Sequence, residues 1–204
     1  AEGIDLREVR AGAGGQLATV MVAKSTPDGY TLLVMSTAMV VNAVVPAKPM
    51  YDLLKDFTGV SQVGVPTSIV IVNPALGVKS LKEFIALARE RSGKRLFGTS
   101  GAGSGTHMTT ASLNPDVSTD LLNTAAGIKG VHVAFKGLPE ALIEIAAGRL
   151  NYGSISMGPT MPFIQDKRVL PLAQISAKRS PLLPDVPVIT EILPKFERDS
   201  THGI

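Results

Sequence analysis

The chain contains no cysteine and no tryptophan among its 204 residues. Without cysteine it has no disulfide bridge and no thiol nucleophile, although this absence does not define the cellular compartment. Aromatic residues make up only 4% of the sequence, so stacking on aromatic rings is not expected to dominate the recognition of bases or sugars. No apolar run reaches the ~18 residues of a membrane-spanning helix, so we expect no membrane span.

Charge and histidine are also sparse. Charged residues make up 18% of the chain, the net charge is +3, and the 20 lysine and arginine residues are spread along the sequence. A nucleic-acid partner would require a basic stripe, so none is expected. The histidines, His107, His132 and His202, lie far apart, and we therefore expect neither a metal site nor a cofactor. The mildly basic balance is compatible with an anionic small ligand.

Strand-like and helix-like segments alternate along most of the chain. Apolar runs predict strands at 30–35, 68–73, 95–98, 131–135, 150–156 and 169–176. Helical spacing or capping predicts helices after residue 16, at 80–92, from 107, at 139–147, at 158–164 and at 188–193. The segment at 80–92 carries the clearest boundaries, because Ser80 and Glu83 form a capping box and Gly93 is the expected stop. The alternation predicts an α/β fold with a largely parallel sheet.

The run at 30–35 is almost continuously apolar, as in a strand that is buried on both faces. It ends in Ser36, Thr37 and Ala38. A small polar loop at the carboxyl end of a parallel strand is where α/β sheets bind ligands. The alternative is a Ser-Thr pair that only caps the next helix.

The central stretch at 96–113, LFGTSGAGSGTHMTTASL, has the order strand, glycine-rich loop, helix. Its glycines allow close backbone approach, and the helix start leaves N–H groups unpaired. Hydroxyl donors are added by Ser100, Ser104 and Thr106, so the loop suits a carboxylate, phosphate or sulfate. The alternative is a structural connection in which Ser104 or Thr106 is the N-cap.

Named catalytic and nucleotide motifs do not fit this loop. A Walker A loop needs a lysine, and none lies between Phe97 and Lys129. The dinucleotide fingerprint fails because Thr106 stands in place of the third glycine, and the hydrolase elbow fails after Ser100. The loop is therefore predicted to hold an anion rather than to transform one.

Six segments, taken in order, resemble the periplasmic solute receptors of the tripartite tricarboxylate transporters, the Bug family (TctC-like). They are residues 10–15 (RAGAGG), 27–33 (PDGYTLL), 56–61 (DFTGVS), 98–104 (GTSGAGS) followed by His107, 131–137 (VHVAFKG), and 176–180 (SAKRS) with 185–187 (DVP). The match extends from about residue 9 to about residue 193.

This resemblance implies a type 2 periplasmic-binding-protein fold, with two α/β domains around a ligand cleft, the first of them incomplete. It implies a periplasmic, non-enzymatic receptor that captures a small carboxylate for the membrane subunits of a tripartite transporter and acts as a monomer. The ligand-binding residues that it implies are Ser36, Thr37, Ala38, Thr99, Ser100, Gly101, Gly103, Ser104, Gly105, Thr106, His107, Ser154 and Ser156.

Members of this family begin with a strand and a glycine-containing loop and continue past the segment that matches residue 193. The resemblance thus implies a chain truncated at both ends. We expect residues 1–75 and 173–204 to form the partial first domain and 76–172 the second, because 76–172 holds a complete alternation of its own. Ala134 and Phe135 stand where relatives usually have Pro-Tyr, and Asn151 and Ile155 stand where acidic residues are common.

Two other functions stay open from the residues alone. One is an α/β enzyme acting on a phosphate or acyl group, with Ser100 or Ser104 as nucleophile and His107 as base; no third orienting residue is evident. The other is a truncated relic without binding activity. A turnover assay separates the enzyme from the receptor, and a ligand-induced shift in melting temperature separates the receptor from the relic.

Overall fold

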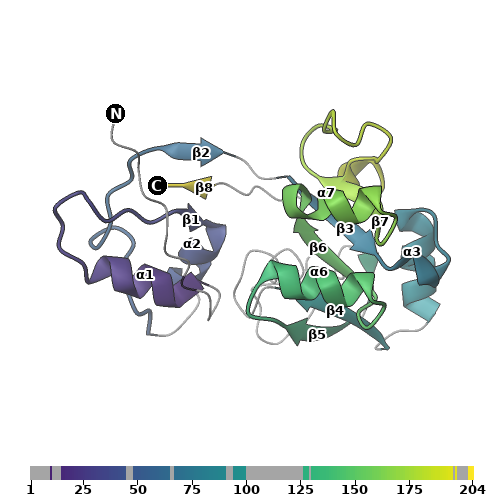
Figure 1. Cartoon of the computed structure of the whole chain (residues 1–204), viewed down its shortest axis with the longest axis horizontal. Coiled ribbons are helices and arrows are strands. Elements are labelled where there is room, and N and C mark those ends of the chain that lie inside the picture. Colours follow the sequence, from purple (N-terminus) through teal and green to yellow (C-terminus); the bar gives the residue numbers. More distant parts are fainter. Residues whose placement is uncertain are drawn as a thin grey trace.

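The computed structural model describes residues 10, 15–44, 48–64, 67–90, 94–99, 126–128, 130–194, 196 and 202–204; for residues 36–38, 41, 202 and 203 it describes the backbone only. These residues form a five-stranded sheet and a three-stranded sheet, which lie in different parts of the molecule (Figure 1).

The larger sheet has the strand order β5-β4-β6-β3-β7. Its strands are β3 (Ser68–Val72), β4 (Arg95–Thr99), β5 (Gly130–Ala134), β6 (Tyr152–Ser156) and β7 (Leu170–Ile175). All five were expected from the sequence to within two residues at each end. Pro171 falls inside β7, an edge strand, where proline leaves no interior ladder hydrogen bond unmade.

The direction of one central strand corrects the expected parallel sheet. β4 runs parallel to β5 and β6, whereas β3 runs antiparallel to both β6 and β7. All five residues of β3 are buried, so its continuous apolar run shows coverage on both faces. Such a run contains no information about strand direction, because a parallel and an antiparallel strand can both be buried on two faces.

Helices cover both faces of this sheet. On one face, α3 (Leu81–Glu90) packs against β3, β4 and β6, and its buried residues include Phe84 and Ala88. On the other face lie α6 (Leu138–Ala146) and α7 (Met157–Gln165), with Leu142 and Ile145 of α6 in the core. The sheet is therefore the middle layer of an α/β/α sandwich, as Figure 1 shows.

The predicted capping of α3 is confirmed with one change of partner. The Ser80 hydroxyl accepts a hydrogen bond from the Glu83 N–H at 3.2 Å. The Glu83 carboxylate accepts from the N–H of Lys79 at 2.8 Å rather than from that of Ser80. Two backbone donors at the helix start are thus satisfied by the two side chains that the sequence identifies.

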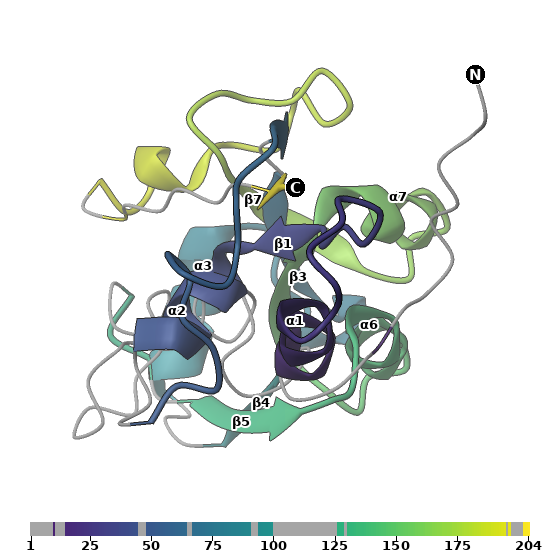
Figure 2. The same cartoon turned by 90° about the vertical axis from the view of Figure 1, so that its left-hand side faces the viewer.

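The smaller sheet has the order β1-β8-β2, with β1 (Met35–Ser36), β2 (Gln62–Gly64) and β8 (His202–Gly203). Both pairings are antiparallel. Two helices accompany it, α1 (Gln16–Ala23) and α2 (Thr37–Val44), and Figure 2 views the protein from their side. The helix expected after residue 16 is thus present. The C-terminal residues lie between segments that are more than a hundred residues earlier in the chain.

The strand expected at 30–35 is wrong over most of its length. Only Met35 belongs to a strand, and residues 30–34 have no regular secondary structure. Tyr30 is 92% exposed and Val34 58% exposed. The physical reason is that no described strand lies along this segment, so its backbone groups have no ladder to join.

The two sheets divide the chain at points other than those expected. The expected first domain would contain 68–72 and 173–175, whereas hydrogen bonding places β3 and β7 in the five-stranded sheet. Residues 202–204, which the expectation also joins to residues 1–75, pair with the smaller sheet: the N–H groups of Val60 and Ser61 donate to the Ile204 carbonyl.

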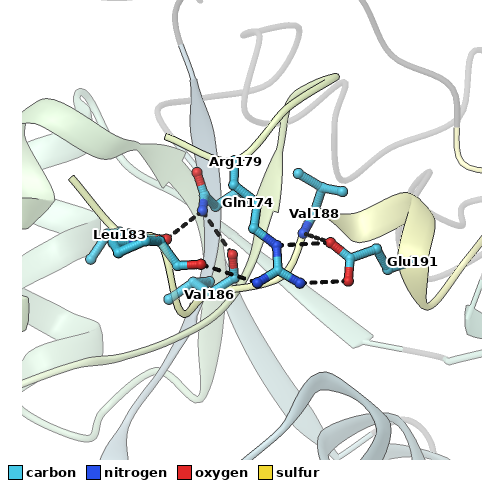
Figure 3. A network of polar contacts seen from close by, with 7 residues as sticks. Gln174, Arg179, Leu183, Val186, Val188 and Glu191 are labelled. Atoms are coloured by element: carbon cyan, nitrogen blue, oxygen red, sulfur yellow. Dashed lines mark hydrogen bonds and ion pairs between the residues drawn. The ribbon is translucent and has the colours of Figure 1, made fainter. Parts of the chain in front are cut away.

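The loop after β7 is held by a polar network around Gln174 (Figure 3). The fully buried Gln174 amide donates to the carbonyls of Leu183 and Val186, both at 2.8 Å, and accepts from the Ser180 N–H at 2.8 Å. Beside it, the Arg179 guanidinium pairs with the carboxylate of Glu191 in the short 3₁₀ helix Ile189–Glu191. A short helix was expected at 188–193. One buried side chain thus organises a loop that has little regular secondary structure.

No helix among the described residues is long and apolar enough to cross a membrane.

Candidate functional site

Polar side chains gather at one end of one face of the five-stranded sheet. Phe97 on β4 is in register with His132 on β5 and with Tyr152 on β6, so these three side chains share a face. Two residues further along, Thr99 at the carboxyl end of β4 and Ser154 in the middle of β6 occupy the same face. The carboxyl ends of parallel strands are the usual position of ligand sites in α/β sheets.

Thr99 and His132 form the central contact of this cluster. The Thr99 hydroxyl lies 2.7 Å from Nε2 of His132, and Thr99 is fully buried. The imidazole is stacked on the Phe97 ring, with centroids 5.2 Å apart and planes 23° apart. Phe97 in turn contacts Tyr152, and Tyr152 contacts Phe84 of α3. A row of rings therefore fixes where the imidazole and the hydroxyl meet.

Serine hydroxyls extend the cluster along β6 and β3. Ser154 is 1% exposed, and its Oγ has no hydrogen-bond partner among the described residues. Ser156 ends β6 opposite Ser68, which begins β3 and is also buried. The Ser156 carbonyl accepts from the Thr160 hydroxyl in α7 at 2.8 Å. A buried hydroxyl without a partner costs about 1–3 kcal/mol, which a bound acceptor would recover.

Close packing on the opposite face keeps the end of β4 in place. A Cβ on Gly98 would lie 2.5 Å from Cδ1 of Leu150 and 3.1 Å from Cβ of Ala141 on α6. A Cβ on Gly153 of β6 would lie 2.8 Å from Cδ1 of Ile145. These two glycines let α6 approach the sheet directly behind Thr99 and Ser154.

The chemistry of this cluster is that of neutral hydroxyls and one imidazole. It contains hydroxyl donors at Thr99, Ser154, Ser156 and Ser68 and the ring of His132, and no carboxylate from the part of the chain that the structure describes. Such a set favours an anionic or acceptor-rich ligand over a cation. Within the described ranges, no group of three or more His, Cys, Asp or Glu side chains is placed to hold a metal ion.

Most of the predicted loop lies outside the described residues. Ser100, Gly101, Gly103, Ser104, Gly105, Thr106 and His107 belong to this part, so their placement and the enzyme hypothesis stay predictions. Among the other expected site residues, the structure brings Thr99, Ser154 and Ser156 together on one sheet face. Ser36 ends β1, and Thr37 and Ala38 begin α2, so this segment is a strand-to-helix junction in the backbone.

Sequence reasoning missed His132 as part of this cluster. It lies in the alternating run Val131-His132-Val133, a pattern that predicts a strand but does not distinguish its two faces. Its partner Thr99 is 33 residues away in the chain. Only the parallel register of β4 and β5 brings the two side chains together.

Comparison with known proteins gives the same fold. The chain is 32% identical over 190 residues to the UPF0065 protein in the tcbD-tcbE intergenic region of Pseudomonas sp. (strain P51), covering 92% of this chain and 54% of that protein. It thus spans about half the length of the curated relatives that it matches.

Two solved structures match the fold of this protein over nearly the whole chain. R. palustris Rpa4515 with adipate matches with a TM-score of 0.86 and 30% identity, covering 95% of this chain and 62% of that one. MatC (Rpa3494) from Rhodopseudomonas palustris with bound malate matches with a TM-score of 0.81 and 27% identity, covering 94% and 63%. The periplasmic-binding-protein fold expected from the resemblance is confirmed. Residues 6–204 match the family described as the tripartite tricarboxylate transporter family receptor, TctC, and the chain belongs to this family.

Proposed function

We propose that the chain is the solute-holding part of a periplasmic receptor that captures a small carboxylate for a tripartite tricarboxylate-type transporter. The observation that carries this proposal is the structural match to Rpa4515, a protein solved with adipate, over 95% of this chain. MatC, with bound malate, supports the same class of ligand. Both named ligands are dicarboxylates, which a protein recognises through hydroxyl and backbone N–H donors.

The polar end of the sheet supplies donors of the required kind. Ser154 has a buried hydroxyl without a described partner, and it shares a sheet face with Thr99 and His132. In this proposal the cluster holds one carboxylate group together with residues 100–107. The junction at residues 36–38 supplies contacts from the smaller sheet, and the domains divide near residue 66 and again near residue 195.

The protein is proposed to bind rather than to transform its ligand, and to act as a monomer that docks on the membrane subunits of the transporter. The described part of the cluster has one imidazole and several hydroxyls but no carboxylate to orient the imidazole as a general base. A p-nitrophenyl acetate or p-nitrophenyl phosphate assay tests this point. Turnover that is lost in a His107→Ala variant would favour the enzyme instead.

The binding test uses adipate and malate with the full chain and isothermal titration calorimetry. A Ser154→Ala variant removes a donor to the ligand and should weaken binding by about 1–2 kcal/mol, or roughly five- to thirtyfold. The same variant should unfold at an unchanged or higher temperature, because the hydroxyl has no described partner in the ligand-free protein.

The matched control is Ser176→Ala, which removes an exposed hydroxyl bonded to the Lys178 carbonyl. It should leave binding unchanged. If neither adipate nor malate gave a heat of binding, this result would contradict the proposed ligand class. A Ser154→Ala variant that loses stability and keeps its affinity would show that this hydroxyl is structural.

A further inference from the structure

The contact between Thr99 and His132 can have its hydrogen bond in either of two directions. The Thr99 hydroxyl oxygen lies 2.7 Å from Nε2 of His132, so one hydrogen lies between these two atoms. The hydroxyl donates it to a bare Nε2, or a protonated Nε2 donates it to the hydroxyl oxygen. The direction determines whether Thr99 presents a donor or an acceptor to a ligand.

A carboxylate oxygen is compatible with only one of these directions. If Thr99 donates to His132, its hydroxyl turns lone pairs toward the ligand, and lone pairs repel an anionic oxygen. If Nε2–H donates to Thr99, the hydroxyl hydrogen is directed to another acceptor, and a carboxylate is a strong one. The neutral ring can take either form, whereas the protonated ring carries hydrogen on both nitrogens and always donates. A carboxylate held at Thr99 therefore favours the form of His132 with hydrogen on Nε2.

The two side chains are held firmly enough for this coupling to operate. Thr99 is fully buried, and its β-branched side chain has few rotamers. The imidazole is stacked on the Phe97 ring at 5.2 Å, and the Phe97 ring lies 5.5 Å from the ring of Tyr152. His132 itself is half-buried on β5, so its ring can exchange protons with water. A change in the protonation of Nε2 is thus passed to the Thr99 hydroxyl.

The strands around His132 carry a cation and no anion. Arg95 is a buried residue of β4 that shares the sheet face of Phe97, two residues earlier. β5 contains no charged side chain, and Tyr152 on β6 is a phenol, which is neutral near pH ~7. Within β4, β5 and β6 there is therefore no carboxylate to stabilise a protonated imidazole.

The charged groups of α3, which packs against this face, are directed elsewhere. The Arg89 side chain donates from Nε to the Ala126 carbonyl at 2.7 Å. The Glu83 carboxylate accepts from the N–H of Lys79 at the helix start, and Glu90 is exposed at the helix end. The carboxylate of a bound solute would thus add a negative charge that the described neighbours of the imidazole do not supply.

We propose that His132 is a positioning residue for solute capture: its Nε2–H donates to the Thr99 hydroxyl, which then donates its own hydrogen to a carboxylate of the ligand. Because the protonated ring has only the donating form, affinity is higher in mild acid and falls as the imidazole loses its proton, ordinarily near pH ~6.5. Binding and protonation favour each other, so capture takes up part of a proton. The inference rests on the proposed function, since it requires a carboxylate at Thr99.

The pH dependence of binding tests this role. The full chain is titrated calorimetrically with adipate and malate from about pH 6 to about pH 8.5, where carboxyl groups that titrate near pH ~4 stay ionised. Wild-type affinity should fall roughly three- to tenfold over this range, and buffers with different heats of ionisation should reveal proton uptake. His132→Gln keeps an N–H donor but cannot gain a proton, so its affinity should not change with pH. Ser176→Ala is the control and should keep the wild-type profile.

A second variant separates positioning from direct contact with the ligand. Thr99→Val keeps the shape of the side chain and removes its hydroxyl, which should weaken binding roughly tenfold. In the Thr99→Val background, His132→Gln should lower the affinity by less than about twofold, because no hydroxyl remains to be oriented. An equal loss in both backgrounds would show that the imidazole acts on the ligand directly and would overturn the positioning role.

Nitrogen-15 NMR of the imidazole supplies a test that needs no substitution. In the wild-type chain saturated with the dicarboxylate, Nε2 of His132 should carry a hydrogen; a bare Nε2 would overturn the inference. A pH dependence that survives in His132→Gln and is lost in His107→Gln would also overturn it. Wild-type affinity that does not change with pH would refute this inference alone, whereas no binding of either dicarboxylate at any pH would refute the proposed function as well.

Discussion

Replacing Gln174 with methionine should destabilise the protein through the loop after β7. Methionine keeps the unbranched shape of glutamine but removes both of its polar ends. The Gln174 side chain makes three hydrogen bonds to backbone groups of Ser180, Leu183 and Val186, each 2.8 Å long. Figure 3 draws the bonds to Leu183 and Val186, and the substitution would break all three bonds at once.

The expected loss follows from the number and burial of these groups. A hydrogen bond of this kind contributes about 1 kcal/mol net, and its loss leaves a donor or acceptor unpaired. Gln174 itself is fully buried, but its three partner residues are half-buried, so water can reach some of the backbone groups that lose their hydrogen bond in the variant. We therefore expect a loss of about 2–3 kcal/mol in the free energy of unfolding. For a chain of this length, the melting temperature should fall by about 4–12 °C.

The assay is urea unfolding followed by circular dichroism in the far ultraviolet. The midpoint should move to lower urea with an unchanged slope, because the surface exposed on unfolding hardly changes. Ser176→Ala is the control, since it removes one exposed hydrogen bond in the same loop and should shift the midpoint little. An unchanged midpoint in Gln174→Met would refute the reasoning, because it would mean that the loop does not depend on these three bonds.

Two further substitutions test the packing behind β4 and the ion pair in the loop after β7. Gly98→Ala should lower the free energy of unfolding by about 1–3 kcal/mol, measured by thermal unfolding, because the added Cβ would lie 2.5 Å from Cδ1 of Leu150. The control is Gly59→Ala, which should change stability little because nothing lies within 4 Å of its Cβ position. Equal effects of the two substitutions would contradict this packing. Hydrogen bonding from Arg179 holds the pKa of Glu191 below its ordinary value of 4.5, so the ion pair stabilises the fold above that pH and loses its effect as pH falls through the lowered pKa. The difference in melting temperature between the wild type and Arg179→Gln should therefore shrink in acid, and a difference that grows below pH 4.5 would be inconsistent with this pairing.

Local sequence patterns determined the regular elements of the five-stranded sheet. The start of α3 was predictable because Ser80 and Glu83 are three residues apart, and one helical turn brings such side chains to the unpaired N–H groups. The end of α6 was predictable from Gly148, whose positive φ of 77° few other residues adopt. In both cases the interacting groups are neighbours in the chain, so the sequence contains the whole interaction.

The site was predictable only in its general position. Glycine and hydroxyl residues after the strand at 95–98 indicated an anion site at a strand end, and the serines at the end of β6 were expected beside it. The pairing of Thr99 with His132 depends on which strands are neighbours and in which register. Neither quantity follows from the composition of a single strand.

The apolar run at 30–35 shows the limit of sequence reasoning most directly. Its composition is that of a buried strand, and the sequence by itself determined that tendency. Whether it becomes a strand depends on a neighbour that accepts and donates its backbone hydrogen bonds, and no described segment does so for residues 31–34. The antiparallel direction of β3 was likewise decided only in the folded molecule. A strand is a property of at least two segments, so tertiary structure decides what local sequence can only favour.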